Sequence, residues 1–479
     1  MVARDRKKKR QESPAVPTVK EGRTEPNSAV GMDPEMPLRE EQSAPGPAGA
    51  PQRKLTGFGT LILHLHPKIV PEDALALDRT FGLGGMATLL FVVLILTGAL
   101  LLFVYEPSPE RAYASVLALE GKVPFGAFVR AIHHWAACGL LVAAFLHLLR
   151  VFYTGAFFPP RRFNWVLGLC LLGLVVGSNF TGYLLPWDQL AFWAVTIGTG
   201  MLAYVPLVGE PLQVALRGGA EVGPKTLSIF FVLHIAILPI LILLATAFHF
   251  WLVRKAGGVM LRQPEGQPGE RRNLVAVRPH LVFREGVAAL VLLAVLLLIA
   301  SLFPAPLQEQ ANPGMSPNPA KAPWYFMGVQ ELLVHVHPLF AVFVVPLLAL
   351  ALLVAIPYVK LGEGPSGRWF HSVKGRRAAV AASLAALVVT PAYVIASESF
   401  LRWPKLLPFF PQWISNGLAP TLLWIALVAG VVWLARRLFG ASRLEATQAA
   451  FTFVVVAFLV LTVTGIWFRG EGMHLVWPW

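Results

Sequence analysis

Four histidines lie inside two apolar segments, and their spacing is the most informative chemical pattern in the sequence. His133 and His147 are 14 residues apart, and His234 and His249 are 15 apart. At about 100° and about 1.5 Å per helical residue, each pair shares one helix face, with roughly 21 to 23 Å between its members. Two such helices side by side would present facing imidazoles at two levels. This pattern predicts bis-histidine ligation of two haems, stacked as an electron path across a bilayer.

A purely structural role is the alternative for each histidine, because a single intramembrane histidine often forms a hydrogen bond between helices. Four histidines in two pairs of matching geometry favour ligation, since polar groups in hydrocarbon are costly and usually functional. His134 is 13 residues from His147, which places it about 140° around the helix. We therefore do not expect His134 to be a ligand.

Glycines recur at the same interval in the neighbouring apolar segments. Gly84 and Gly98 are 14 residues apart, as are Gly168 and Gly182. Glycine permits the close backbone approach that a planar macrocycle between helices needs, so we expect these four residues to border the haems. Arg130 precedes the first histidine by three residues on the same side of the helix, where its guanidinium could hold a haem propionate.

The composition is that of a polytopic membrane protein. Hydrophobic residues make up 56% of the 479 residues and charged residues 14%, which excludes an ordinary soluble globule. Cys138 and Cys170 both lie in apolar runs, so they indicate no disulfide framework, thiolate metal site or covalent haem attachment. The haems are therefore expected to be b-type and non-covalent. The net charge of +14 follows the loops, and no nucleic-acid partner is expected.

Nine segments are long and apolar enough to cross a hydrocarbon core of about 30 Å. They lie near 83–104, 132–153, 164–185, 229–253, 285–304, 338–359, 378–397, 417–435 and 449–468. The sequence therefore predicts an all-α polytopic membrane protein, with a four-helix dihaem bundle followed by about five further transmembrane helices.

The distribution of Lys and Arg predicts the orientation of these spans. Residues 1–55 open with a basic cluster and continue without apolar periodicity, which indicates a disordered tail. The loops on the same side as this tail carry most of the Lys and Arg, so the N-terminus is expected to be cytoplasmic and the C-terminus outside. His133 and His234 would then form the outer pair, and His147 and His249 the inner pair.

Three stretches carry a family resemblance. They are RAIHHWAACGLLVAAFLHLLRVFYTGAF (130–157), NFTGYLLPWDQLAFWAV (179–195) and LHIAILPILILLATAFHFWLVRK (233–255). They resemble the cytochrome b/b6 family, the dihaem cytochrome b subunit of quinol:cytochrome c oxidoreductases of the bc type. The 15-residue spacing in the third stretch is similar to the b6 branch. A weaker resemblance to the quinol-site domain covers 285–360, so that a b6-like part and this domain share one chain.

The resemblance implies a division of the chain. After the tail at 1–55 it places the dihaem four-helix domain at 56–255, a cytoplasmic linker at 256–284 and the quinol-site domain at 285–360. The additional transmembrane helices at 361–479 have no assigned place in the family's common plan. The extra cysteine-attached haem of the b6 branch is not expected, because the aligned residue is Gly82.

In the family, a Pro-Glu-Trp-Tyr motif after the fifth span carries the glutamate that takes a quinol proton. The matching stretch here is Ala-Pro-Trp-Tyr at 322–325, so Pro323 stands at the glutamate position. Trp324 and Tyr325 are the expected site residues, and Glu331 is the expected proton acceptor.

His335 and His337 are alternatives to this acceptor, because histidine titrates near neutral pH. At the inner face, Arg254 and Lys255 are expected to stabilise a reduced quinone, although positive-inside anchoring explains these two residues equally well.

The resemblance implies that the chain oxidises quinol near the outer face and passes electrons across the membrane through two b haems, with proton translocation by a Q cycle. The implied partners are a Rieske iron–sulfur protein, a c-type cytochrome, the membrane quinone pool, the lipid bilayer and a second copy in a homodimeric complex, in a bacterial cytoplasmic membrane. Two alternatives are a dihaem anchor of a dehydrogenase or hydrogenase, and a proton-coupled transporter, which would bind no chromophore. The dihaem anchor would not explain PWDQ at 186–189.

Overall fold

The computed structural model describes residues 68–76, 80–259, 273–362, 364 and 367–477. The tail expected at 1–55 and the central part of the linker expected at 256–284 lie outside this range. Within it, nine helices are long and apolar enough to cross a membrane, as the sequence predicts. They are α3 (Leu83–Leu101), α5 (Gly126–Tyr153), α6 (Arg162–Leu184), the continuous α9–η3–α10 segment (Pro224–Lys255), α11 (Val277–Leu302), η5–α13–η6 (Leu339–Tyr358), α14 (Val373–Ser399), η7–α16 (Ile414–Phe439) and α17 (Arg443–Trp467).

The chain is an integral, multi-pass membrane protein of the all-α class. Large aliphatic side chains stay exposed along the middle of the helices, among them Leu96, Leu244 and Leu298, each about 60% exposed. Such exposure would be costly in water and is expected where lipid is the solvent. The described strands are two short ones, β1 (Ile69–Pro71) and β2 (Leu274–Ala276), which pair antiparallel.

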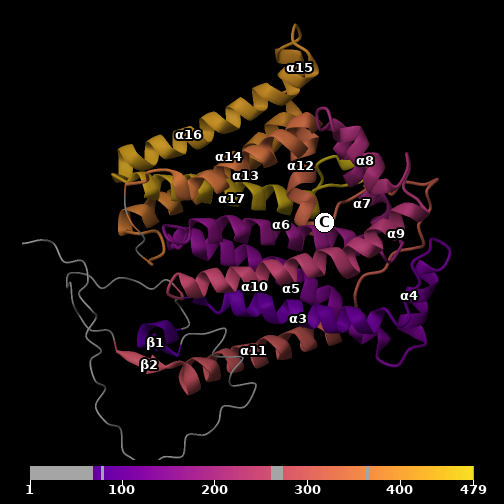
Figure 1. Ribbon diagram of the computed structural model, residues 1–479. Helices are drawn as coiled ribbons and strands as arrows, with labels where there is room; N and C mark the ends of the chain where they lie inside the picture. Colours follow the sequence, from indigo (N-terminus) through magenta and orange to yellow (C-terminus); the bar gives the residue numbers. More distant parts are fainter. Residues whose placement is uncertain (1–67, 77–79, 260–272, 363, 365–366, 478–479) are drawn as a thin grey trace, which may run out of the picture. The chain divides into compact units, whose positions relative to one another are not determined.

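The first four spans form one packed group around a shared core. In it, α3 packs against α5, α5 against α6, and α10 against α6, as Figure 1 shows in indigo to magenta. Leu90, Ala136, Leu140, Val175 and Ile242 are buried together at its centre. Helix α11 packs on the outside of α3 and α5. Its start at Val277 lies eight residues before the predicted span at 285, so part of the expected linker is helical.

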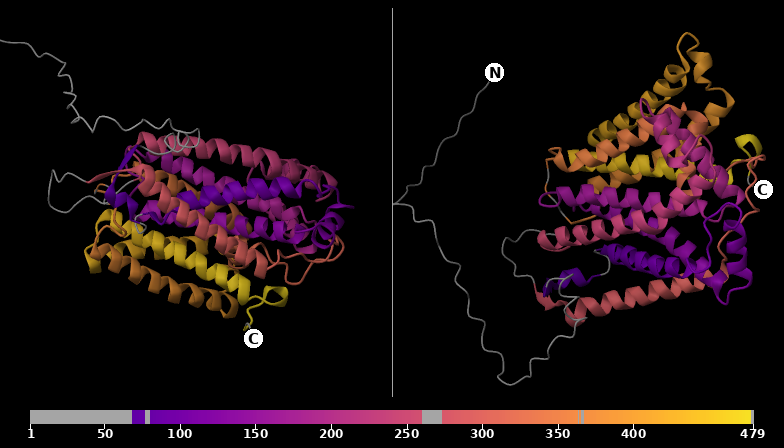
Figure 2. Two further views of the ribbon diagram at one scale, coloured as in Figure 1. Left: turned by 90° about the horizontal axis from the view of Figure 1, so that it is seen from below. Right: turned by 45° about the vertical axis from the view of Figure 1, so that its right-hand side comes forward.

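The last three spans form a second packed group, drawn in orange to yellow in Figures 1 and 2. Helix α17 packs along α14 and α16. Its interface consists largely of alanines, which allow helix axes to approach closely. These are Ala378, Ala382 and Ala386 of α14, Ala435 of α16, and Ala446, Ala449 and Ala457 of α17.

The elements that follow the spans at one end of both groups are short helices and loops. They include α4 (Ala112–Gly121), α7 (Gln189–Gly200), η2 (Met201–Tyr204), α8 (Gly209–Arg217), η4 (Trp324–Phe326), α12 (Met327–His335), α15 (Trp403–Leu406) and η8 (Glu471–Met473). Asp188 begins α7 by accepting a hydrogen bond from the Ala191 amide at 2.8 Å, and its other oxygen accepts one from the Gln308 amide at 2.9 Å. This carboxylate therefore ties the PWDQ stretch to the loop that carries Trp324 and Tyr325.

Candidate functional site

The structure brings the four histidines together as two facing pairs. The ring centres of His133 and His234 lie 6.2 Å apart, and those of His147 and His249 lie 6.4 Å apart. Two metal–nitrogen bonds of roughly 2 Å each, with each nitrogen about 1.1 Å from its ring centre, put two axial imidazoles roughly 6.3 Å apart. Both separations therefore fit one iron between each pair.

The hydrogen bonds of the first pair leave the correct ring nitrogen for a metal. His234 donates from Nδ1 to the Ser178 carbonyl at 2.9 Å. Nδ1 of His133 lies 2.9 Å from the Thr97 hydroxyl, which itself donates to the Val93 carbonyl, so the imidazole is the donor. Metal-binding histidines characteristically donate their second N–H in this way. Nε2 of each ring is then the free lone pair.

The second pair is less completely anchored. Nδ1 of His249 is buried and has no hydrogen-bond partner among the described residues. The fit to a haem at this level therefore rests on the ring separation and on the two residue types.

Each of the four predicted glycines lies against one histidine ring. A Cβ built on Gly182 would stand 2.4 Å from Cε1 of His234, and one on Gly98 would stand 3.2 Å from the same atom of His133. At the other level, Gly84 faces His147 and Gly168 faces His249, with a Cβ 3.5 Å and 3.6 Å from Cε1. The glycines thus make room for the imidazoles, most tightly at Gly182, and their expected contact with the haems stays a prediction.

A π-helical turn explains why one histidine interval is longer than the other. His234 lies in η3 (Leu233–Ile237), where the helix widens to π geometry between α9 (Pro224–Val232) and α10 (Leu238–Lys255). Such a turn accommodates one extra residue in an α-helix and occurs frequently at functional sites. The 15-residue interval therefore covers the same helical path as the 14-residue interval of α5, and both pairs meet.

Arg130 has protein partners where a haem propionate was expected. Its guanidinium donates to the carbonyls of Ala305 and Pro306, at 3.0 and 2.6 Å, and forms a partly exposed ion pair with Glu120. These contacts hold residues 305–306, which follow α11, against the N-terminal end of α5. A propionate would have to share this guanidinium with three existing acceptors.

Comparison with known proteins identifies the family. The sequence model of the family described as Cytochrome b/b6/petB matches residues 70–257. The cytochrome b6 of Heliobacterium modesticaldum is 40% identical over 206 residues, which cover 43% of this chain and 96% of that protein. The chain belongs to the cytochrome b/b6 family.

Other similar proteins extend the match beyond the first four spans. The cytochrome b subunit of a cytochrome bc complex from Chlorobaculum thiosulfatiphilum is 38% identical over 290 residues, 60% of this chain and 66% of that subunit. A chain of a hyperthermophilic respiratory Complex III has the same fold over 80% of this chain and 90% of its own, with a TM-score of 0.57 and 22% identity. Proteins of the cytochrome b/b6 family bind two b-type haems and act with quinone, which agrees with the imidazole geometry.

Trp324 and Tyr325 lie in the segment between α11 and α12, residues 303–326, which we call the quinol-site loop after the role that the family resemblance predicts for it. Tyr325 packs against the core of the first four spans, beside Tyr183 and Cys138. Its hydroxyl is buried without a hydrogen-bond partner in the described part of the chain, and burial raises its pKa. Trp324 is 40% exposed.

Glu331 is buried in an ion pair, and its expected role as proton acceptor stays a prediction, which this geometry argues against. Its carboxylate is fully buried and accepts hydrogen bonds from Nε of Arg469 at 2.9 and 3.2 Å. His335 lies 3.0 Å from it. Burial alone would raise its pKa, but the hydrogen bonds from His335 and Arg469 and their charges outweigh this and hold the pKa below its usual range. An ion-paired carboxylate of this kind is a poor proton acceptor.

Arg469 was not singled out from the sequence, because one arginine after the last span looks like an interfacial residue. Its side chain is fully buried, and besides Glu331 it pairs with Glu398 and donates to the Met473 carbonyl at 2.8 Å. The bonds and charges from both carboxylates outweigh burial and raise its pKa. Arg469 thus joins α12, α14 and the C-terminal segment.

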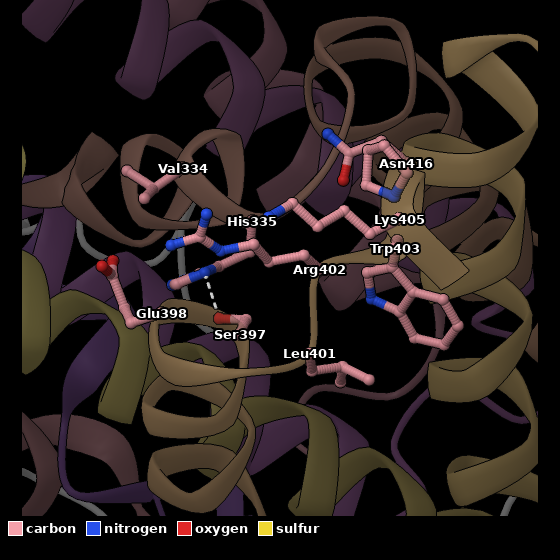
Figure 3. A pocket seen from close by; sticks show the side chains of 10 residues that line it. Val334, His335, Ser397, Glu398, Leu401, Arg402, Trp403, Lys405 and Asn416 are labelled. Atoms are coloured by element: carbon pink, nitrogen blue, oxygen red, sulfur yellow. Dashed lines mark hydrogen bonds between the residues drawn. The ribbon is translucent and has the colours of Figure 1, made fainter. Parts of the chain in front are cut away.

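The two alternative histidines occupy different positions. His335 belongs to the same network, with Nδ1 2.7 Å from the Ser397 hydroxyl. Figure 3 shows this contact at the edge of a pocket of about 430 Å³, lined also by Glu398, Arg402 and Lys405. His337 instead lies two residues before η5 (Leu339–Val344), and its Nδ1 accepts a hydrogen bond from the Leu339 amide at 3.3 Å.

At the other end of the bundle, Lys255 places its ammonium 5.0 Å from the ring centre of Trp251, which is a cation–π contact. It and Arg254 end α10, six and five residues after His249. Both residues therefore lie at the end of the bundle that carries the second histidine pair, and their expected contact with quinone stays a prediction.

Proposed function

We propose that this chain is the cytochrome b subunit of a bc-type complex, which oxidises quinol at the His133–His234 end and reduces quinone at the His147–His249 end. The observation that carries the proposal is the presence of two facing imidazole pairs, with ring centres 6.2 and 6.4 Å apart, that would each hold one haem iron, in a chain of the cytochrome b/b6 family. The bc complex subunit of Chlorobaculum thiosulfatiphilum, matched over 290 residues, supports the assignment to such a complex.

His133 and His234 would hold one haem, and His147 and His249 the other. When bound, the haems supply two one-electron redox centres at two depths of the membrane. The protein fixes the imidazoles through Thr97 and the Ser178 carbonyl, and it excludes water by enclosing the rings between four helices. Net electron transfer from a quinol at one face to a quinone at the other moves charge across the membrane, as a Q cycle requires.

The quinol would bind beside Trp324 and Tyr325, where the quinol-site loop meets the bundle. The buried, unpartnered hydroxyl of Tyr325 can donate to a quinol or quinone oxygen. Pro323 supplies no titratable group, and Glu331 is held by Arg469, so neither takes the proton in this proposal. At the opposite end, Arg254 and Lys255 supply positive charge for a reduced quinone.

A second subunit must accept one of the two electrons that quinol releases. The described residues hold no cluster of three or more His, Cys, Asp or Glu side chains that could bind a further metal. A Rieske iron–sulfur protein and a c-type cytochrome are the partners that fit this requirement, in a homodimeric complex of a bacterial cytoplasmic membrane with the N-terminus inside. The excess of Lys and Arg in the loops on that side supports the orientation.

The test is a reduced-minus-oxidised spectrum of the purified complex and of two ligand variants. We expect two b-type components of different potential, both reduced on addition of quinol. His147→Ala and His249→Ala should each remove the same component and leave the other. Loss of different components would contradict the pairing, and a complex without either component would favour the transporter that the sequence leaves as an alternative.

A further inference from the structure

We propose that the C-terminal segment Ile466–Val476, which we call the C-terminal strap, positions the quinol-site loop, and that Arg469 is the positioning residue. The inference rests on the proposed function for its kinetic consequence. Its structural part concerns the contacts between two segments of this chain that lie more than 130 residues apart.

The strap comprises the last two residues of α17 and the closed turn that follows them. The Val476 amide donates to the Phe468 carbonyl, and the Gly470 amide donates to the His474 carbonyl, both at 3.0 Å. Arg469 points inward from this turn, and its guanidinium also donates to the Met473 carbonyl within the strap. A short segment closed on itself in this way can transmit the position of α17 to whatever it touches.

The strap touches the quinol-site loop at two places. Lys321 donates from Nζ to the Ile466 carbonyl at 2.8 Å, and the Gly472 amide donates to Oδ1 of Asn318 at 2.6 Å. Both loop residues lie within seven positions of Tyr325, so the strap holds the chain immediately before the quinol-site residues.

A third connection runs through α12. Arg469 donates to Glu331 from two nitrogens. Gln330, which precedes Glu331 in α12, binds the loop backbone on both sides of Lys321. Its Oε1 accepts from the Ala322 amide at 2.6 Å, and its Nε2 donates to the Ala320 carbonyl at 2.7 Å. The position of Arg469 is thereby passed to Ala320 and Ala322, close before Pro323.

Close packing makes this connection stiff. A Cβ on Gly328 of α12 would stand 2.6 Å from the ring of Phe458 in α17, and one on Gly465 would stand 2.9 Å from Met327. The helices therefore meet at contact distance through one glycine on each. Because Glu331 and Arg469 are both fully buried, water cannot replace their hydrogen bonds when one partner is lost.

The pocket in Figure 3 marks where this network meets solvent. Its wall includes His335 and Glu398, and the Glu398 side chain is 27% exposed. The Arg469 pair with Glu398 is thus partly hydrated, whereas its pair with Glu331 is dry. The dry pair with Glu331 is consequently the one whose loss should loosen the loop most.

The experiment compares the whole purified complex carrying Arg469→Gln, Arg469→Lys or Lys321→Met with wild type. Arg111→Gln is the matched control, since Arg111 forms an ion pair with Glu106 at 2.8 Å but is 69% exposed. Three kinds of measurement are made on each variant. They are hydrogen–deuterium exchange of peptides covering 303–326, the KM and kcat of quinol oxidation, and the midpoint potentials of the haems.

We expect Arg469→Gln to raise amide exchange in 318–326 at least tenfold and the KM for quinol about tenfold, with unchanged haem potentials. Arg469→Lys should restore part of both effects, because it keeps the charge but not the bidentate geometry. Lys321→Met should raise exchange severalfold without touching the ion pairs, and Arg111→Gln should change nothing.

Unchanged exchange and unchanged KM in an Arg469→Gln complex that retains both haem spectra would overturn the proposal. If the Arg469→Gln complex does not assemble, the Lys321→Met complex provides the test. A wild-type rate of amide exchange in 318–326 of that complex would overturn the proposal. If the wild-type complex oxidises no quinol, the proposed function fails, while the exchange data still report whether the strap holds the loop.

Discussion

The histidine bundle and the quinol-site loop are held in place by opposite means. In the bundle, each functional imidazole is fixed by a glycine, a hydroxyl or a carbonyl on the adjacent helix, all spaced at helical intervals. In the loop, the chain around Trp324 and Tyr325 is held by polar contacts with α12 and with the C-terminal strap, to which the Arg469–Glu331 ion pair also connects α12. Periodic packing thus positions the four histidines, and a few specific polar contacts position the loop that carries Trp324 and Tyr325.

The strongest test of this difference fills the space that one glycine leaves beside a histidine ring. Gly182→Ala would place a Cβ 2.4 Å from His234, whereas Gly168→Ala would place one at 3.6 Å from His249. We expect the first variant to lose most of one b-haem spectral component, because overpacking displaces the ring. The second should retain both components. Equal spectra for the two variants would show that the glycines do not set the imidazole positions.

The corresponding test for the loop is Glu331→Gln. It removes the charge that faces Arg469 inside a dry ion pair, and breaking such a pair by loss of one partner costs about 3 kcal/mol or more. We expect this loss in the free energy of unfolding the strap, measured by native-state proteolysis of the C-terminus. Glu106→Gln, in an exposed ion pair, should cost less than about 1 kcal/mol. A similar cost for both would mean that Glu331 contributes no more than a surface residue.

A smaller effect is expected from restoring the family's acid in the loop. Pro323→Glu places a carboxylate next to Trp324, and proton transfer by a positioned side chain contributes substantially to rates. We expect the rate of quinol oxidation to change about tenfold and its pH profile to gain a limb near the pKa of the new carboxylate. Pro317→Glu, in the same loop but farther from Tyr325, serves as the control. Identical profiles for both variants would remove position 323 from the site.

The smallest expected effect comes from pH. The folded pKa of Glu331 is lowered, so its stabilising contribution is present above the ordinary glutamate pKa of about 4.3 and is lost as the pH falls through the folded value. Proteolysis of the C-terminus should therefore be independent of pH from 7 to about 5 and accelerate below 4. Glu331→Gln should be fast at all pH values; acceleration already near pH 6 would point to another group.

The difference between the two regions also explains what the sequence predicts. The spans, the four histidines and the four glycines follow helical intervals, so their positions along the chain carry the geometry. The contact between Glu331 and Arg469 joins residues 138 positions apart. No sequence pattern near either residue predicts that the two side chains meet. For the same reason the sequence shows Arg130 as a free cation, although Glu120 and two carbonyls already occupy it.

The π-helical turn at η3 has a consequence for how this chain could vary. A helix can gain or lose one residue inside a π-helical turn while the residues before and after the turn stay on the same helix face. An insertion or deletion there therefore alters the geometry of one turn and leaves the same histidines facing their partners. A one-residue gap in this helix between related sequences should therefore be placed at 233–237. Deleting Ala236 would shorten the interval to 14 and convert the turn to a regular α-helix, with both imidazoles still facing their partners.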